Sequence, residues 1–169
     1  MLQRMLGAAL LNKHVYEEIE ADSSATKDAL LVVIMVSLAA GFGNFGNAQL
    51  GLIEVILLGP LMGLVRWAIW AWLTYIVGTK VLPTENTSAN WGELARTTAF
   101  AQSPGMLNIL GVLVGPIIFS VISFWQLACM VVAIRQALDY ESTLRAVGVV
   151  VIAFIPVLLL NFALLSMMM

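Results

Sequence analysis

Long apolar runs separated by short polar segments dominate this chain. A helix needs about 20 mostly apolar residues to cross a bilayer core of roughly 30 Å. Apolar residues are concentrated in five runs, which predict spans at about residues 29–45, 50–81, 94–114, 117–137 and 144–165. The pattern therefore predicts an all-α fold, a polytopic membrane bundle of five transmembrane helices occupying residues 29–169.

Two of the boundaries between these runs are irregular. The run 50–81 would make about 48 Å of helix, so we expect it to tilt, to kink at Pro60 or to extend past the membrane surface. The region after Gly92 could hold one long span or two. The turn dipeptide Gly115-Pro116 favours a hairpin of two spans. The first of these begins weakly, with "ARTTAFAQSP", and we expect it to enter the bilayer only partway before Pro104.

Lysine and arginine residues set the orientation of the predicted bundle. With five spans, one side carries every positive charge found at or beyond the ends of the runs: Arg4, Lys13, Lys27, Lys80, Arg96, Arg135 and Arg145. The opposite side carries no lysine or arginine, as the positive-inside rule requires. A four-span model would place two of these arginines on the wrong side. We therefore expect a cytoplasmic N-terminus and a C-terminus outside.

The composition agrees with a membrane protein and narrows its chemistry. Hydrophobic residues make up 61% and charged residues 11% of the chain, against roughly 45–50% and about 25% in soluble domains. The net charge of −2 gives no reason to expect a nucleic-acid partner. One histidine and one cysteine cannot assemble a metal site, and the sequence motifs of soluble enzymes are missing. We therefore expect no cofactor, no metal and no enzymatic activity.

Residues 1–28 form a predicted cytoplasmic segment with two features. Leu2, Met5, Leu6 and Ala9 recur at helical spacing, which predicts either an amphipathic helix on the inner membrane surface or a cap packed over the bundle. The stretch "EEIEAD", with Glu17 and Glu18, is acidic and is expected to project into solvent or towards a protein partner. Further along, Asn90 and Glu93 have the spacing of a helix capping box.

Arg66 is the one charge inside the stretch "GLVRWAIWAW". A charge at that depth costs about 2.5 kcal/mol or more. At 100° per residue, Gly59, Gly63 and Trp70 share its side of the helix, where small residues let another helix approach. We therefore expect Arg66 to face protein, with a cation–π contact to Trp70 and hydrogen bonds to an amide of Asn108, Gln126 or Asn161. No acidic residue of the chain is well placed, so the expected counter-charge comes from a partner chain or a lipid headgroup.

Three stretches together resemble a known family. They are "VYEEIEADSSATKDALLVVIMVSLAAG" (residues 15–41), "WGELARTTAFAQSPGMLNILG" (91–111) and "WQLACMVVAIRQALDYESTLRAVGVVVIA" (125–153). They resemble the Yip family, five-span membrane proteins that interact with Rab GTPases, and particularly its short prokaryotic branch. The resemblance implies a non-enzymatic protein of the bacterial inner membrane. Eukaryotic members use a sizeable cytosolic N-terminal region, whereas about 28 residues precede the first span here. GTPase binding is therefore doubtful.

Three functions remain open from the sequence. The first is a non-enzymatic Yip-type protein that acts through protein or lipid contacts, made by the N-terminal helix, the acidic stretch and the hairpin 133–145 with Arg135 and Arg145. The second is an accessory or assembly subunit of a larger membrane complex, whose polar residues in the membrane face a neighbour. The third is a small-molecule transporter or channel, which would need a polar path through the bundle.

Overall fold

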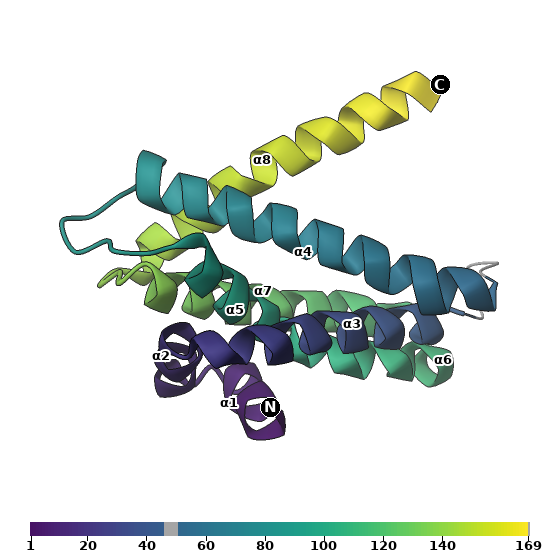
Figure 1. The fold of residues 1–169 in the computed structure, drawn as a ribbon. Coiled ribbons are helices and arrows are strands. Elements are labelled where there is room, and N and C mark those ends of the chain that lie inside the picture. The colour runs from purple at the N-terminus through teal and green to yellow at the C-terminus, as the bar shows by residue number, and fades with distance from the viewer. Residues whose placement is uncertain (46–50, 169) are drawn as a thin grey trace.

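The protein is built from helices packed side by side (Figure 1). The structure, a computed structural model, describes residues 1–45 and 51–168, with side chains described as far as Leu159. Within these residues it contains helices and loops but no strand. Three helical stretches are long and apolar enough to cross a membrane: Ser23–Gly43, Glu54–Val81 and Ile117–Ala137. The predicted all-α membrane bundle is confirmed.

The helix bounds follow the apolar runs closely. Two short helices, α1 (Leu2–Ala9) and α2 (Lys13–Ala21), precede a 3₁₀ turn, η1 (Ser23–Ala25), and the first long helix, α3 (Thr26–Gly43). After the second and third runs, described below, come α7 (Ile117–Ala137) and α8 (Thr143–Met168). The bounds of α7 are those expected for the fourth span, and α8 extends the fifth by a few residues. The start of the second span, at residue 50, lies outside the described residues.

The second run remains one long helix despite Pro60. It consists of a π-helical turn, η2 (Glu54–Leu58), then α4 (Gly59–Ile76), and a second π-helical turn, η3 (Val77–Val81). Proline lacks the N–H that an α-helix needs and crowds the preceding turn. The wider turn of η2, in which the Gly59 N–H bonds to the Glu54 carbonyl, lies directly before the proline. A π-bulge is a usual way to absorb such a disturbance.

The third run, predicted as a weakly beginning span over 94–114, is not one continuous helix. It consists of α5 (Trp91–Phe100), a 3₁₀ segment η4 (Ser103–Leu110) and the short α6 (Gly111–Val114). The helix α5 ends just before Pro104 and Gly105, which disfavour its continuation. The chain does not stop there. It continues along α3 to the far end, where a Cβ at Gly111 would lie 2.6 Å from the Gly43 carbonyl oxygen (Figure 1).

Burial in this bundle is confined to the contacts between helices. Every residue of α5 from Leu94 to Phe100 is buried, so this broken segment forms the centre of the bundle. One apolar core joins it to α1, α2, α3 and α7, and a second joins it to the first half of α8. Large apolar side chains such as Leu57, Leu113 and Phe124 are exposed. An apolar outer surface is expected where the surrounding solvent is lipid.

Candidate functional site

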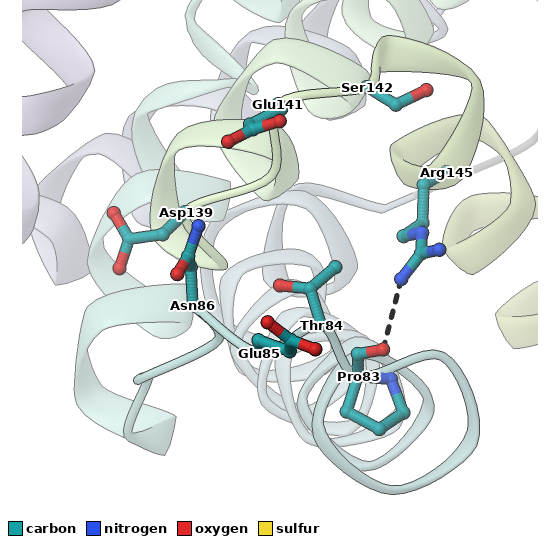
Figure 2. A pocket seen from close by; sticks show the side chains of 8 residues that line it. All are labelled: Pro83, Thr84, Glu85, Asn86, Asp139, Glu141, Ser142 and Arg145. Carbon is teal, nitrogen blue, oxygen red and sulfur yellow. Dashed lines mark hydrogen bonds between the residues drawn. The ribbon is translucent and has the colours of Figure 1, made fainter.

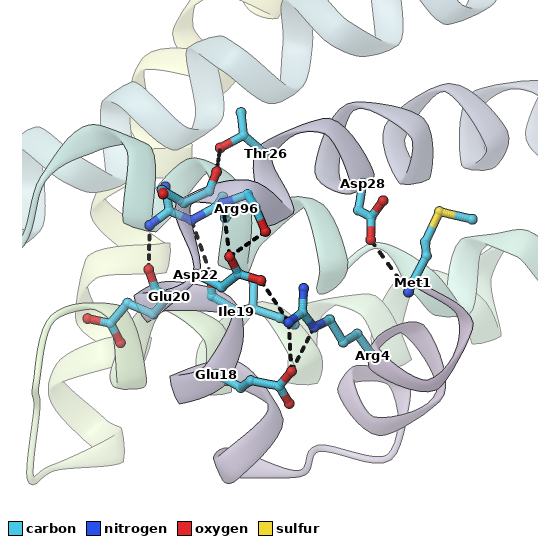
Figure 3. Close-up of polar contacts among 11 residues, drawn as sticks. Met1, Arg4, Glu18, Ile19, Glu20, Asp22, Thr26, Asp28 and Arg96 are labelled. Carbon is cyan, nitrogen blue, oxygen red and sulfur yellow. Dashed lines mark hydrogen bonds and ion pairs between the residues drawn. The ribbon is translucent and has the colours of Figure 1, made fainter.

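The N-terminal helices α1 and α2 are joined by a cluster of ion pairs (Figure 3). The Arg4 guanidinium donates to Glu18 Oε1 at 2.7 Å and to Asp22 Oδ2 at 2.8 Å. Hydrogen bonds from Ser24 and from Arg4 lower the pKa of the Asp22 carboxyl to about 2. The expected acidic patch is therefore partly neutralised within the chain, because Glu18 and Asp22 share one arginine.

Arg96 fastens α2 to the bundle. Its side chain is buried, and it donates from Nε to the Ile19 carbonyl at 3.1 Å and from Nη2 to the Glu20 carbonyl (Figure 3). These are among the last carbonyls of α2, which lack helical partners and carry partial negative charge. The sequence identified Arg96 only as a cytoplasmic charge. Alanine and threonine flank it in "LARTTAF", and these small neighbours could have indicated that Arg96 would be buried.

The helix α1 lies against the flank of the bundle. Met5 and Ala8 are buried, the Tyr16 hydroxyl donates to the Ala8 carbonyl at 3.0 Å, and Trp125 Nε1 donates to the Ala9 carbonyl at 2.8 Å. Trp125 lies about 18 Å along α7 from its end at Ala137. The helix α1 therefore packs on the bundle through one face, as the second prediction has it but on the flank, and its contact with the membrane surface stays a prediction.

The outward face of α1 carries a row of leucines. Leu2, Leu6 and Leu10, spaced one helical turn apart, have exposed fractions of 67%, 58% and 75%. The charged Arg4 points instead towards α2 (Figure 3). We call this row the leucine ridge. In water such a ridge would be costly, since each fully exposed leucine forgoes about 1.5–3 kcal/mol of burial.

Glu17 and Glu20 lie where α2 meets α7 and the 139–141 loop. Glu17 accepts a hydrogen bond from Gln136 of α7 at 2.8 Å and lies 3.3 Å from the exposed His14. Burial, together with the negative charges of Asp139, Glu93 and Glu17, raises the pKa of Glu20 to about 7, opposed by Arg96. This end of the bundle therefore carries a carboxyl that titrates near neutrality.

A polar pocket of about 730 Å³ lies between two loops at this same end (Figure 2). It is lined by residues 83–86 and by Asp139, Glu141, Ser142 and Arg145. Arg145 donates to the Pro83 carbonyl at 3.0 Å and lies over the Tyr140 ring. Arg135 donates to the Tyr140 and Glu141 carbonyls. Both arginines predicted as contact residues thus hold the loops in place, and their role in partner contacts stays a prediction.

A second cavity, of about 560 Å³, lies within the apolar part of the bundle and is lined by residues of the stretch "GLVRWAIWAW". We call it the Arg66 cleft. Gly59, Gly63, Arg66 and Trp70 of α4 all line it, together with the second half of α3, η4, the middle of α7 and Phe154 of α8. The helical spacing thus placed the four residues on one surface. Gly63 packs against Ser37 of α3, whereas the atom nearest to a Cβ at Gly59 would be the Glu54 carbonyl oxygen of the same long helix.

Among the described residues, Arg66 makes none of the contacts that the sequence led us to expect. In the described part of the chain no hydrogen bond or ion pair reaches its guanidinium, which is exposed in the cleft. Trp70 packs on Phe154 with ring centroids 4.7 Å apart, and not on the arginine, because α8 crosses α4 at this point. Gln126 donates instead to the Gln102 carbonyl. The side chain of Asn161 lies outside the described residues.

Two residues that line this cleft carry buried polar atoms without partners among the described residues. Asn108 is only 8% exposed, and its Oδ1 accepts no hydrogen bond from any described residue. The Trp70 Nε1–H is buried and likewise donates to none of them. Buried polar groups are nearly always satisfied in native structures, so each exception requires an explanation. Ser37, Gln102 and Ser123, which the sequence did not single out, add polar atoms to the same cleft.

This arrangement defines a class of protein. It is a helical membrane bundle with a docked amphipathic helix, and its described residues hold no group of three histidine, cysteine or acidic side chains suited to a metal. The Yip1 domain family model matches residues 10–165. The chain belongs to this family, and the resemblance seen in the sequence is confirmed. Comparisons with curated proteins and with solved structures gave no match.

Proposed function

We propose that this protein is non-enzymatic and acts through contacts with its neighbours in the membrane. The observation that carries the proposal is the leucine ridge on α1, held at a fixed place by contacts on the opposite face of the helix. The exposed leucines of such a helix are favourable against acyl chains, and the end of α1 lies about 18 Å along α7 from Ala137. We assign the inner leaflet of the bacterial cytoplasmic membrane as the surface it contacts, since the positive charges favour a cytoplasmic N-terminus.

A fluorescent probe on the ridge tests this proposal. Leu6→Cys, made in a Cys129→Ser background, is labelled with bimane in the full-length protein reconstituted in liposomes. We expect blue-shifted emission that is quenched by lipids carrying a nitroxide on the acyl chain. The matched control is His14→Cys, a fully exposed position on α2, which should show water-like emission. Water-like emission from the ridge as well would contradict the proposal.

A role as an accessory subunit of a larger complex is the second candidate. It is favoured by the Arg66 guanidinium, which has no counter-charge among the described residues. Purification from membranes in a mild detergent, followed by mass spectrometry, separates the two functions. A stoichiometric membrane protein that is lost from Arg66→Leu would support the accessory role. A lone small particle of unchanged composition would count against it.

The orientation and the number of crossings need their own measurement. Five crossings place the two termini on opposite sides of the membrane. Reporters fused to either end, one active only in the cytoplasm and one active only outside it, would test this. We expect the cytoplasmic reporter to be active at the N-terminus and the external reporter to be active at the C-terminus. Activity of one reporter at both ends would contradict the five-span model.

A further inference from the structure

We propose that the Arg66 cleft binds the phosphate of an anionic amphiphile, with a hydroxyl-bearing headgroup entering the cleft and acyl chains lying along its apolar rim. The proposal deepens the proposed function, because it names a class of lipid that the protein contacts. The shared chemistry is a phosphate ester with a nearby hydroxyl. It could come from a phospholipid or from a soluble glycerol phosphate, and the experiment below separates these sources.

Charge is the first argument. None of the described residues that line the cleft is acidic, and the acidic residue of the same long helix, Glu54, lies about 18 Å away along the axis. A guanidinium in an apolar surrounding is costly unless it is paired. It presents a planar fork of donors that matches a phosphate. An anion bound in this cleft would therefore offset the cost of the unpaired Arg66 guanidinium, which no described residue neutralises.

Two polar atoms that lack partners among the described residues support the same assignment independently of charge. The Trp70 Nε1–H is a donor, so it can bind an anionic oxygen. Asn108 Oδ1 is an acceptor on a nearly fully buried side chain, so it requires a donor from the ligand. Phosphate oxygens alone satisfy Arg66 and Trp70 but repel the Asn108 oxygen. A headgroup that carries both phosphate and hydroxyl groups would match all three, with a small rotation of the Trp70 and Asn108 side chains to bring their buried atoms to the ligand.

The shape of the cleft favours a ligand with apolar chains. It extends from Asn44, at the end of α3, to Trp70 and Met130 deeper in the bundle. Its polar lining is bordered by Trp67, Leu127 and Phe154. Beyond Ala153 most described residues of α8 are exposed, and the helix diverges from α7 (Figure 1). The cleft can therefore admit a headgroup from the membrane side while leaving acyl chains against an apolar surface.

The test measures thermal unfolding of the purified full-length protein in a neutral detergent. The probes are phosphatidylglycerol, phosphatidylcholine and soluble glycerol 3-phosphate. We expect phosphatidylglycerol at about 100 times its Kd to raise Tm by about 5 °C or more, and phosphatidylcholine to raise it much less. Arg66→Gln should abolish the difference, and Arg66→Lys should retain part of it. The matched control is Lys80→Gln, which removes an equal charge from the end of the same long helix and should behave as wild type.

Each outcome decides the assignment. Stabilisation by phosphatidylglycerol that depends on Arg66 supports a lipid, and Arg66-dependent stabilisation by glycerol 3-phosphate alone supports a soluble ligand of the same chemistry. Equal stabilisation of wild type and Arg66→Gln, or none in either, overturns the proposal. A stoichiometric protein that requires Arg66 for binding also overturns it, since a carboxylate would then occupy the cleft.

A second variant covers the case in which Arg66→Gln does not fold. Ser123 is exposed and lines the cleft, so Ser123→Trp should fill the opening without disturbing the core. In native mass spectrometry, wild type should retain phosphatidylglycerol and Ser123→Trp should lose it. Retention by both would overturn the proposal. These measurements do not involve α1, so a failure here with lipid contact at Leu6 intact would remove the cleft assignment and leave the proposed function standing.

Discussion

Arg96 donates a hydrogen bond from Nε to the backbone carbonyl of Ile19 at 3.1 Å, although 77 residues separate the two in sequence. With its second bond, to Glu20, this buried side chain closes the C-terminal end of α2. Because of this contact, the N-terminal segment packs as part of the membrane domain. The leucine ridge therefore occupies a fixed place relative to the long helices.

Replacing Arg96 should loosen this attachment. Arg96→Gln leaves at least one buried carbonyl of α2 without a donor, and we expect a loss of about 2 kcal/mol in the free energy of unfolding. The single cysteine, Cys129, is buried and has Ala9 and Tyr16 beside it. Labelling of Cys129 by N-ethylmaleimide should therefore accelerate. The control Arg145→Gln removes an exposed arginine in the first turn of α8, and an equal acceleration there would show that the effect is not specific to α2.

Stability should fall as the pH rises from about 4.5 to about 7. The pKa of Glu20 is raised from 4.5 to about 7 in the folded protein. The folded state therefore holds a proton in this window that the unfolded state has released, and raising the pH favours unfolding. Below pH 3.8 the sign reverses, because the lowered pKa of Asp22 contributes stability that is lost as the pH falls towards about 2.

Glu20→Gln isolates the first of these effects. The variant cannot ionise, so its Tm should vary less than that of wild type between pH 4.5 and 7. Glu141→Gln, at an exposed loop position, is the matched control and should keep the wild-type slope. An unchanged slope in Glu20→Gln would show that another group causes it.

Gly43 should tolerate no side chain. A Cβ there would overlap the Asn108 carbonyl, whose carbon would lie 2.7 Å away, and this neighbour is backbone that cannot rotate aside. We expect Gly43→Ala to cost about 1–3 kcal/mol. Gly59→Ala is the control, because the nearest atom to its Cβ would lie 3.5 Å away. That variant should be neutral or slightly more stable, since alanine favours helix. Equal Tm values for the two variants would contradict the close approach of α3 and η4.

Tyr140 should stabilise the end of the long helix. Its hydroxyl lies 2.6 Å from the Leu82 carbonyl and 2.9 Å from the Gly78 carbonyl, where η3 ends. Tyr140→Phe removes the donor from these two carbonyls, and we expect a loss of about 1–2 kcal/mol with faster proteolysis of the loop 82–90. Tyr75→Phe changes a partly buried tyrosine elsewhere on the same helix and should leave both measurements unchanged.

Local patterns along the sequence predicted local structure well. The helical class and the bounds of α7 followed from apolar run length and from Gly115-Pro116, which are local signals. The Asn90–Glu93 capping box is confirmed with both of its hydrogen bonds. The broken third run was only half foreseen. Pro104 predicts an interruption, but the continuation of η4 along α3 depends on the contact between Gly43 and the Asn108 backbone, which no local pattern reveals.

Contacts between distant segments account for what the sequence missed. The helical spacing placed Arg66 on one face with Gly63 and Trp70, since that requires only the period of a helix. The same reasoning proposed Trp70 and Gln126 as its partners, and both side chains make other contacts. Those contacts involve α8 and η4, whose packing is set by the whole bundle. Arg96 illustrates the same limit, because its acceptors lie on a helix 77 residues earlier.

The hydrogen bond from Trp125 to the Ala9 carbonyl has a consequence for the order of assembly. The two residues are 116 positions apart, so α1 leaves the ribosome long before α7 exists. Chains are made from the N-terminus, and the docking surface for α1 is complete only after most of the protein has been synthesised. Under the proposed function, the leucine ridge would hold the waiting helix against lipid during this interval. The helix α1 is thus made well before α7 and reaches its final position only after α7 has been made.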